Sequence, residues 1–297
     1  MSEDSATGEI VRRIPVIGEK LAARIEGAPT VAVLRMSGII SQIGMARRGA
    51  INMTELAGPI DRAFKLPRLK AVALAVNSPG GAPVQSALIA GRIRALAEEK
   101  ELPIFAFCED VAASGGYWLA CAADEIYANG ASIVGSIGVV SAGFGFPALL
   151  ERFGVERRVH TAGDKKMLLD AFQVEKKKEV ERLRDIQDDM HEQFKSYVRE
   201  RRGARLKADE DVLFSGEFWT GRRALELGLI DGIGDVRTIM REKFGEKVSL
   251  RLVAAPKRFR LQQLFGGRAR GGWAPDGLVD DAVAALEDRL LWGRFGL

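Results

Sequence analysis

The apolar residues of the chain follow two alternating patterns. Short runs of apolar, often β-branched residues are typical of buried strands, and apolar residues three or four positions apart are typical of helices. The patterns predict strands at 30–40, 69–76, 103–108, 125–129 and 247–255, and helices at 54–65 and 84–100, the first of them capped by Asn52 or Thr54. Buried strands that alternate with amphipathic helices are joined by parallel crossovers, so the sequence predicts an α/β fold.

A long, charged helix is predicted from Val174 to Gly203. Its apolar residues recur on one face over about six to eight turns, and its charged residues are typical of a solvated surface. We expect the apolar stripe to pack on the core; it consists of Val180, Leu183, Ile186, Met190 and Phe194.

Composition divides the chain into three parts. Residues 1–28 form a polar leader, residues 29–255 the core domain, and residues 256–297 a basic, glycine-interrupted tail with an amphipathic helix predicted at 278–292. We expect that helix to dock on its own or a neighbouring subunit. The alternative interpretation is a basic, aromatic anchor for anionic lipid.

The overall composition is that of a folded protein. The chain has 297 residues, 47% of them hydrophobic and 28% charged, and its net charge of +4 is too small to indicate nucleic-acid binding. Its two cysteines, Cys108 and Cys121, provide neither a disulfide framework nor a zinc site. The N-terminus is acidic, and no apolar run reaches the roughly 18–20 residues of a membrane span. We therefore expect a cytoplasmic protein, at most peripheral at the inner face of the membrane.

Two loops that follow predicted strands contain candidate chemistry. Residues 77–81 read Asn-Ser-Pro-Gly-Gly, and adjacent glycines let backbone N–H groups approach a substrate oxygen, although a plain β-turn is the alternative. Ser114 lies at a predicted strand-to-helix turn, where a serine is an exposed nucleophile or a helix cap.

A serine nucleophile needs a base, and the choice is narrow. His191 lies on the charged helix, where a surface position is expected, and His160 ends a strand-like segment. Lys165 and Lys166 precede an apolar patch, and a lysine acts as a base only when burial lowers its pKa enough to keep it neutral. Ser136 lies between small residues, where it either holds such a lysine or simply permits close packing.

Together these motifs resemble the signal peptide peptidase A family of serine peptidases, the S49 type, which has a ClpP/crotonase-like fold. The resemblance spans about residues 30–255, and the matching segments are NSPGG at 77–81, ASGGYWLACAADEIYAN at 113–129, GSIGVV at 135–140, GDKKMLLDAF at 163–172 and FWTGRRALELGLIDGIG at 218–234. It implies a βαβ superhelical core that carries the long charged helix and the C-terminal tail. It also implies ring-shaped homo-oligomers, in which the serine and the lysine can come from neighbouring subunits.

The resemblance assigns roles to particular residues. Ser114 matches the nucleophile, Lys166 the general base and Ser136 the serine that positions the lysine. The amides that hold the oxyanion match Gly81 and Gly115, and Gly80 and Gly116 beside them are expected to contact substrate. Lys165 stands where the family has an aromatic or small residue, and Ala171 where it has a proline, so the choice between the two lysines stays open.

The sequence thus predicts a serine endopeptidase that needs no metal or cofactor. Its expected substrates are unfolded apolar peptides, such as signal-peptide remnants or membrane-protein fragments. Two alternatives are a crotonase-like acyl-CoA enzyme, which would need a carboxylate base, and an inactive scaffold at a membrane surface.

Overall fold

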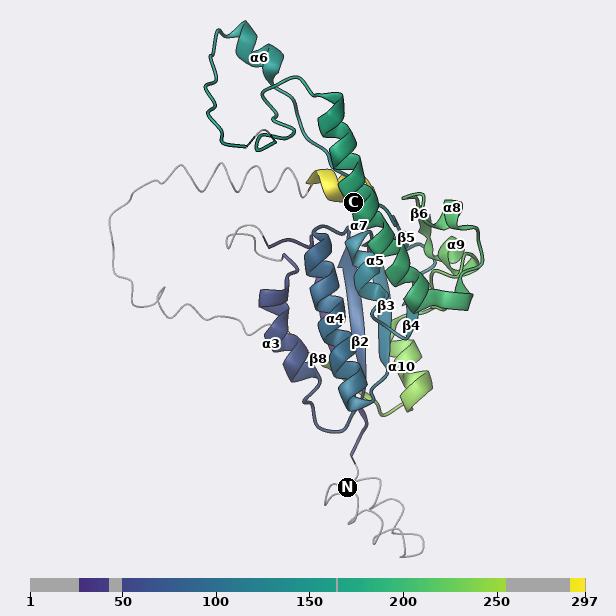
Figure 1. Cartoon of the computed structure of the whole chain (residues 1–297). Helices are drawn as coiled ribbons and strands as arrows, with labels where there is room; N and C mark the ends of the chain where they lie inside the picture. Colours follow the sequence, from purple (N-terminus) through teal and green to yellow (C-terminus); the bar gives the residue numbers. More distant parts are fainter. Residues whose placement is uncertain (1–26, 43–49, 164, 255–288, 297) are drawn as a thin grey trace, which may run out of the picture.

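A mostly parallel β-sheet forms the centre of the protein (Figure 1). The computed structural model describes residues 27–42, 50–163, 165–254 and 289–296. Within these residues the main path of the sheet has the strand order β6-β5-β3-β2-β1-β8, β4 pairs with both β3 and β7, and only the β5–β6 pair is antiparallel. The strands are β1 (Thr30–Ser37), β2 (Leu69–Ser78), β3 (Ile104–Ala113), β4 (Glu125–Ala128), β5 (Ile133–Gly135), β6 (Phe218–Thr220), β7 (Gly232–Ile233) and β8 (Ser249–Leu252). The predicted α/β class is confirmed.

The helices begin close to their predicted positions. Asn52 caps the first described helix by accepting a hydrogen bond from the Glu55 amide at 2.9 Å. The helices are α3 (Met53–Ala63), α4 (Pro83–Lys100), α5 (Gly115–Ala120), α6 (Pro147–Arg152), α7 (Lys177–Arg202), α8 (Glu210–Leu213), α9 (Gly221–Glu226) and α10 (Val236–Phe244), with a 3-10 turn at Gly203–Arg205.

Alternation along the central strands gives the sheet two apolar faces. Leu34, Leu74 and their alternating neighbours join the larger cluster, which includes buried residues of α3, α4, α5 and α7. Ala71 and Ala73 face the other way, toward Met240 on α10. Burial on both faces explains why β2 is a nearly continuous apolar run rather than an alternating one.

Strand β3 changes partners along its length, and this positions the loops that follow it. Its first half pairs with β4 through 105–108, and its last three residues pair with β5 through 111–113. The divergence brings the end of β5 beside the end of β3. Parallel strands place their carboxyl ends at one edge of the sheet, where α/β proteins bind ligands.

Only the C-terminal part of α7 packs on the core, which corrects the predicted apolar stripe. Phe194 and Val198 are buried, whereas Met190 is 39% exposed and the helix projects past the sheet toward its N-terminus (Figure 1). The helical period identifies residues that share a face, but it does not show how far that face stays covered.

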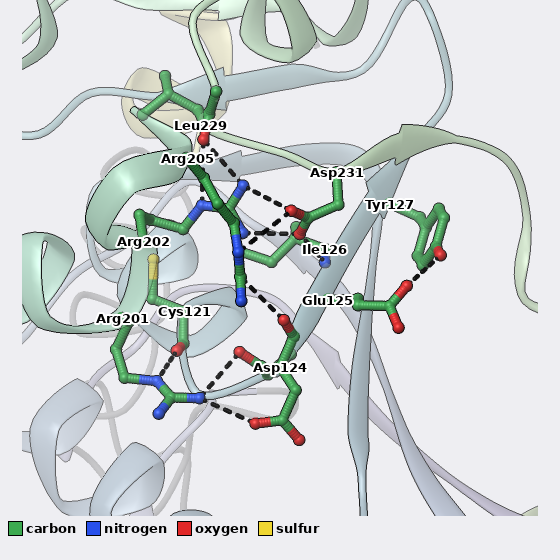
Figure 2. A network of polar contacts seen from close by, with 12 residues as sticks. Cys121, Asp124, Glu125, Ile126, Tyr127, Arg201, Arg202, Arg205, Leu229 and Asp231 are labelled. Atoms are coloured by element: carbon green, nitrogen blue, oxygen red, sulfur yellow. Dashed lines mark hydrogen bonds and ion pairs between the residues drawn. The ribbon is translucent and has the colours of Figure 1, made fainter. Parts of the chain in front are cut away.

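A buried ion pair fastens the end of α7 to the sheet (Figure 2). Arg202 lies against Asp231, with N–O distances of 2.6 and 3.0 Å, and also donates to the Gly228 carbonyl. Beside it, Arg201 donates to Asp124 and to the Cys121 carbonyl. These contacts join α7 to the residues that follow α5 and to the segment between α9 and β7.

The outer parts of the chain are described only in part. Residues 1–26 of the predicted leader and most of the predicted tail, 256–288 and 297, lie outside the described residues. Residues 289–293, the end of the helix predicted at 278–292, are helical. None of the helices in the described ranges is long and apolar enough to span a membrane.

Candidate active site

The Gly-Gly turn after β2 needs glycine at both positions. Gly80 and Gly81 have φ angles of +107° and +139°, in the region that favours glycine. The Gly80 carbonyl accepts from the Ile40 amide at 2.8 Å, and a methyl group at Gly81 would lie 2.1 Å from the Ile40 carbonyl oxygen. The segment around Ile40 therefore packs closely against the backbone of Gly80 and Gly81.

Ser114 lies on a sharp turn between β3 and α5. Its φ and ψ of 52° and −124° are unusual for a residue with a side chain, and its amide donates to the Gly135 carbonyl at 2.8 Å. The side chain makes no capping hydrogen bond to α5, so the helix-cap alternative is not supported. A strained strand-to-helix turn that leaves the hydroxyl available is the geometry of a nucleophile elbow.

The two glycine loops meet at Ser114. A methyl group on Gly80 would lie 2.8 Å from Ser114 Cβ and 2.9 Å from the Gly115 nitrogen, and one on Gly115 would lie 3.4 Å from the Gly81 nitrogen. Within the described chain, neither the Gly81 amide nor the Gly115 amide donates a hydrogen bond. Two unpaired N–H groups beside a serine are suited to hold an oxyanion.

The two other glycines of these loops differ in their surroundings. Gly80 is buried directly against Ser114. Gly116 is buried against β2, where a methyl group would lie 2.5 Å from the Ser78 carbonyl oxygen. Its visible role is to let α5 pack closely on β2.

Ser136 follows β5 directly and belongs to the same site. The strand ends at Gly135, and Ser136 has a φ of +55°. Its amide donates to the Glu217 carbonyl at 2.6 Å, and the residue is 7% exposed. The antiparallel β5–β6 pair thus holds a second strained serine beside Ser114.

A pocket of about 510 Å³ contains both serines. Its lining residues are Pro79, Gly81, Pro83, Ser114, Ser136, Gly138, Val139, Val140, His191, Ser215, Gly216, Leu291 and Arg294. Sequence reasoning missed the contributions of His191 and of the C-terminal segment. The helical period does not show that α7 passes over the 136–140 loop, where His191 Nε2 lies 3.1 Å from the Ile137 carbonyl oxygen.

In the single chain, Lys165 and Lys166 lie outside the pocket that contains Ser114. Lys165 and Lys166 are exposed on a turn within a segment that we call the arm, residues 141–176, and neither lines the Ser114 pocket. In Figure 1 the arm, which contains α6, extends away from the sheet. The chain alone brings together Ser114, Ser136 and the two free amides, but not the lysine. His160 is also exposed in the arm.

The thiols of Cys108 and Cys121 are buried in the core. Burial raises the pKa of both the Cys108 and the Cys121 thiols to about 12. Across the described ranges, no three histidine, cysteine, aspartate or glutamate side chains are grouped to hold a metal ion.

Comparison with known proteins gives a family match that covers most of this site. The model of Peptidase family S49 matches residues 96–248, just over half of the chain. That range includes Ser114, Gly115, Ser136 and both lysines of the arm. A Synechocystis protein named "Putative protease slr0021" is 31% identical over 233 residues, which are 76% of this chain and 80% of that protein.

A second relative is much longer than this chain. A Brucella abortus protein named "Na(+)/H(+) antiporter NhaA" is 47% identical over 272 residues, which are 90% of this chain but only 37% of that protein. The chain thus spans little more than a third of that relative. Among solved structures, a mutant of the 1510-N membrane-bound stomatin-specific protease aligns with 77% of this chain and 99% of its own, at 14% identity and a TM-score of 0.47.

Proposed function

Because the chain belongs to peptidase family S49, a family of serine peptidases, we propose that it is a serine endopeptidase with Ser114 as its nucleophile. The observation that carries this proposal is the site itself. A serine on a strained strand-to-helix turn lies beside two glycine amides that have no hydrogen-bond partner in the described chain. The ClpP/crotonase-like form of the α/β fold, which the family resemblance implies, is part of the proposal.

The proposed reaction has two stages. Ser114 Oγ attacks the peptide carbonyl carbon while a neutral lysine amine takes the hydroxyl proton, and the Gly81 and Gly115 amides donate to the oxyanion. The C–N bond then breaks, the leaving amine takes the proton from the lysine ammonium, and an acyl-enzyme remains. Water, deprotonated by the same lysine, attacks the ester carbonyl carbon, the ester C–O bond breaks, and the acid is released while Ser114 Oγ takes the proton back from the lysine ammonium. Lys166 is the proposed base and Ser136 the residue that holds its amine.

The composition of the pocket favours this reaction over acyl-CoA chemistry. No aspartate or glutamate is among the described residues that line it, whereas a crotonase-like enzyme would need a carboxylate base there. Several apolar side chains line the same pocket: Pro79, Pro83, Val139 and Val140. They support unfolded apolar peptides, such as signal-peptide remnants or membrane-protein fragments, as the substrate class.

We propose that the lysine comes from a neighbouring copy in a ring. The arm that carries Lys166 lies away from its own Ser114 pocket (Figure 1). Its apolar side chains are largely exposed: Phe144 (78%), Phe153 (71%) and Val174 (76%), with Leu149 and Val155 near half. Exposed apolar residues of this number are typical of a subunit interface. An arm that packs on the next subunit would bury them and carry Lys166 toward the neighbour's Ser114.

Mixing inactive subunits tests this assembly. Ser114→Ala protomers and Lys166→Ala protomers are expected to be inactive alone and to recover a fraction of the peptidase activity when co-assembled. Some interfaces then join an intact serine to an intact lysine. A mixture that stays inactive, although native mass spectrometry shows hetero-oligomers, would place both residues in one chain.

The proposal also includes the place in the cell where the protein acts. A cytoplasmic peptidase would reach membrane-derived peptides through peripheral contact of its basic tail, residues 256–297, with anionic lipid. Truncation after residue 255 is expected to weaken sedimentation with anionic vesicles and to leave sedimentation with zwitterionic vesicles unchanged. Equal sedimentation of both proteins with anionic vesicles would contradict the lipid contact.

A further inference from the structure

We infer that His191 is a positioning residue for the proposed peptidase reaction, because its ring holds the turn that carries Ser136. The inference rests on the proposed function, in which Ser136 holds the lysine amine. His191 lies on α7, half-buried, and lines the Ser114 pocket. Its Nε2 atom is 3.1 Å from the Ile137 carbonyl oxygen, one residue beyond Ser136.

The turn around Ser136 is strained and needs external support. Gly135 and Ser136 have φ angles of +115° and +55°, and the second costs energy for a residue with a side chain. Two backbone hydrogen bonds support the turn: the Ser114 amide donates to the Gly135 carbonyl, and the Ser136 amide donates to the Glu217 carbonyl. In addition, the contact with His191 is the one hydrogen bond from a side chain to residues 135–137 in the described chain.

The chemistry of this contact gives the Nε2 atom of His191 a positioning role rather than a role in proton abstraction. A carbonyl oxygen only accepts hydrogen bonds, so Nε2 of His191 must carry the hydrogen. The neutral ring is therefore the Nε2–H tautomer, and the protonated ring keeps the same donor. In either state, Nε2 is occupied and does not take a proton from Ser114.

Helix α7 is well placed to set the distance between the two serines. Three residues after His191, Phe194 stacks on Trp118 of α5 with ring centroids 4.8 Å apart. Trp118 in turn donates its amide hydrogen to the Ser114 carbonyl at 3.0 Å. One turn of α7 thus contacts both α5, which begins directly after Ser114, and the turn that carries Ser136.

Three substitutions at His191 test whether the N–H donor alone, rather than the whole imidazole ring, is required. His191→Gln keeps an N–H donor the same number of bonds from the backbone, His191→Asn shortens it, and His191→Leu removes it. We expect kcat to fall roughly 2- to 12-fold in the Asn and Leu variants, the equivalent of one neutral hydrogen bond, with KM and Tm little changed. The Gln variant is expected to keep near wild-type kcat. His160→Gln, in the exposed arm, is the matched control.

The opposite results would overturn the inference. These are a wild-type kcat in the Leu variant, a Gln variant as slow as the Leu variant, or a decrease in kcat that is accompanied by a matching decrease in Tm. Nitrogen-15 NMR of the ring nitrogens gives an answer that does not depend on activity, since the chain has two histidines and His191→Gln assigns the signals. We expect an Nε2–H tautomer for His191, and an Nδ1–H tautomer would contradict the contact. An inactive wild-type enzyme with the expected tautomer would instead count against the proposed function alone.

Discussion

Replacing Arg202 with methionine should destabilise the protein strongly, because it removes one half of a buried ion pair. The Arg202 side chain is 1% exposed and the Asp231 side chain 19%. Arg202 supplies two close contacts to the Asp231 carboxylate (Figure 2). It supplies two more to the Gly228 carbonyl. Methionine matches much of the volume of the arginine stem but supplies no donor.

The size of the expected loss of stability follows from the contacts that Asp231 keeps after the substitution. After the substitution, its carboxylate keeps the Ile126 amide at 2.8 Å and Arg205 at the longer distance of 3.8 Å. Removing one partner of a buried pair leaves an uncompensated charge and costs about 3–5 kcal/mol. For a domain of this size, that corresponds to a decrease in Tm of about 6–20 °C.

Chemical denaturation followed by circular dichroism at pH 7 measures the free energy of unfolding directly. Arg92→Met is the control, because its pair with Asp61 has both side chains 43% exposed and should contribute no more than about 1 kcal/mol. Adding Asp231→Asn to Arg202→Met should recover part of the loss by removing the unpaired charge. An Arg202→Met protein within about 1 kcal/mol of the parent would refute this reasoning, and so would a double variant less stable than the single one.

Three further predictions concern the site and the core. Gly81→Ala places a methyl group 2.1 Å from a backbone carbonyl oxygen, so it should displace an oxyanion donor and lower kcat by about 100-fold in a peptide-hydrolysis assay; wild-type kcat would contradict the assignment. Cys108 and Cys121 should resist iodoacetamide at pH 8 until the protein is unfolded, because a pKa of about 12 instead of 9.0 leaves roughly a thousandfold less thiolate; alkylation of the native protein, detected by mass spectrometry, would refute their burial. Lys166→Met should abolish peptide hydrolysis and Lys165→Met only weaken it, and the reverse outcome would move the base to Lys165.

The parts of the fold and site that depend on local chemistry could be predicted from the sequence. The strand run 69–76 and the capped start of α3 follow from burial, period and hydrogen bonding within a few residues. Ser114 follows similarly, because the sequence places it between a predicted strand and two glycines, where a strand-to-helix turn is expected. Its neighbours 77–81 could be added because parallel strands end at one edge of the sheet.

The remaining features depend on contacts between distant segments. The place of His191 in the pocket results from how α7 crosses the 136–140 loop, which a helical period does not encode. The partly exposed stripe of α7 has the same cause, since coverage depends on where the neighbouring elements end. The lysine was predicted from family resemblance, and its exposed position in the single chain shows why spacing alone could not bring it to Ser114.

Covalent labelling of Ser114 tests the central claim most directly. The 297-residue chain is treated with a serine-reactive peptidyl phosphonate, and intact mass spectrometry with peptide mapping locates the adduct. Ser196→Ala, which changes an exposed serine of α7, is the matched control and should label normally, whereas Ser114→Ala should not label. We predict one adduct per active site, on Ser114, together with loss of peptide hydrolysis. An adduct on another serine, or peptide hydrolysis that persists in Ser114→Ala, would contradict the account.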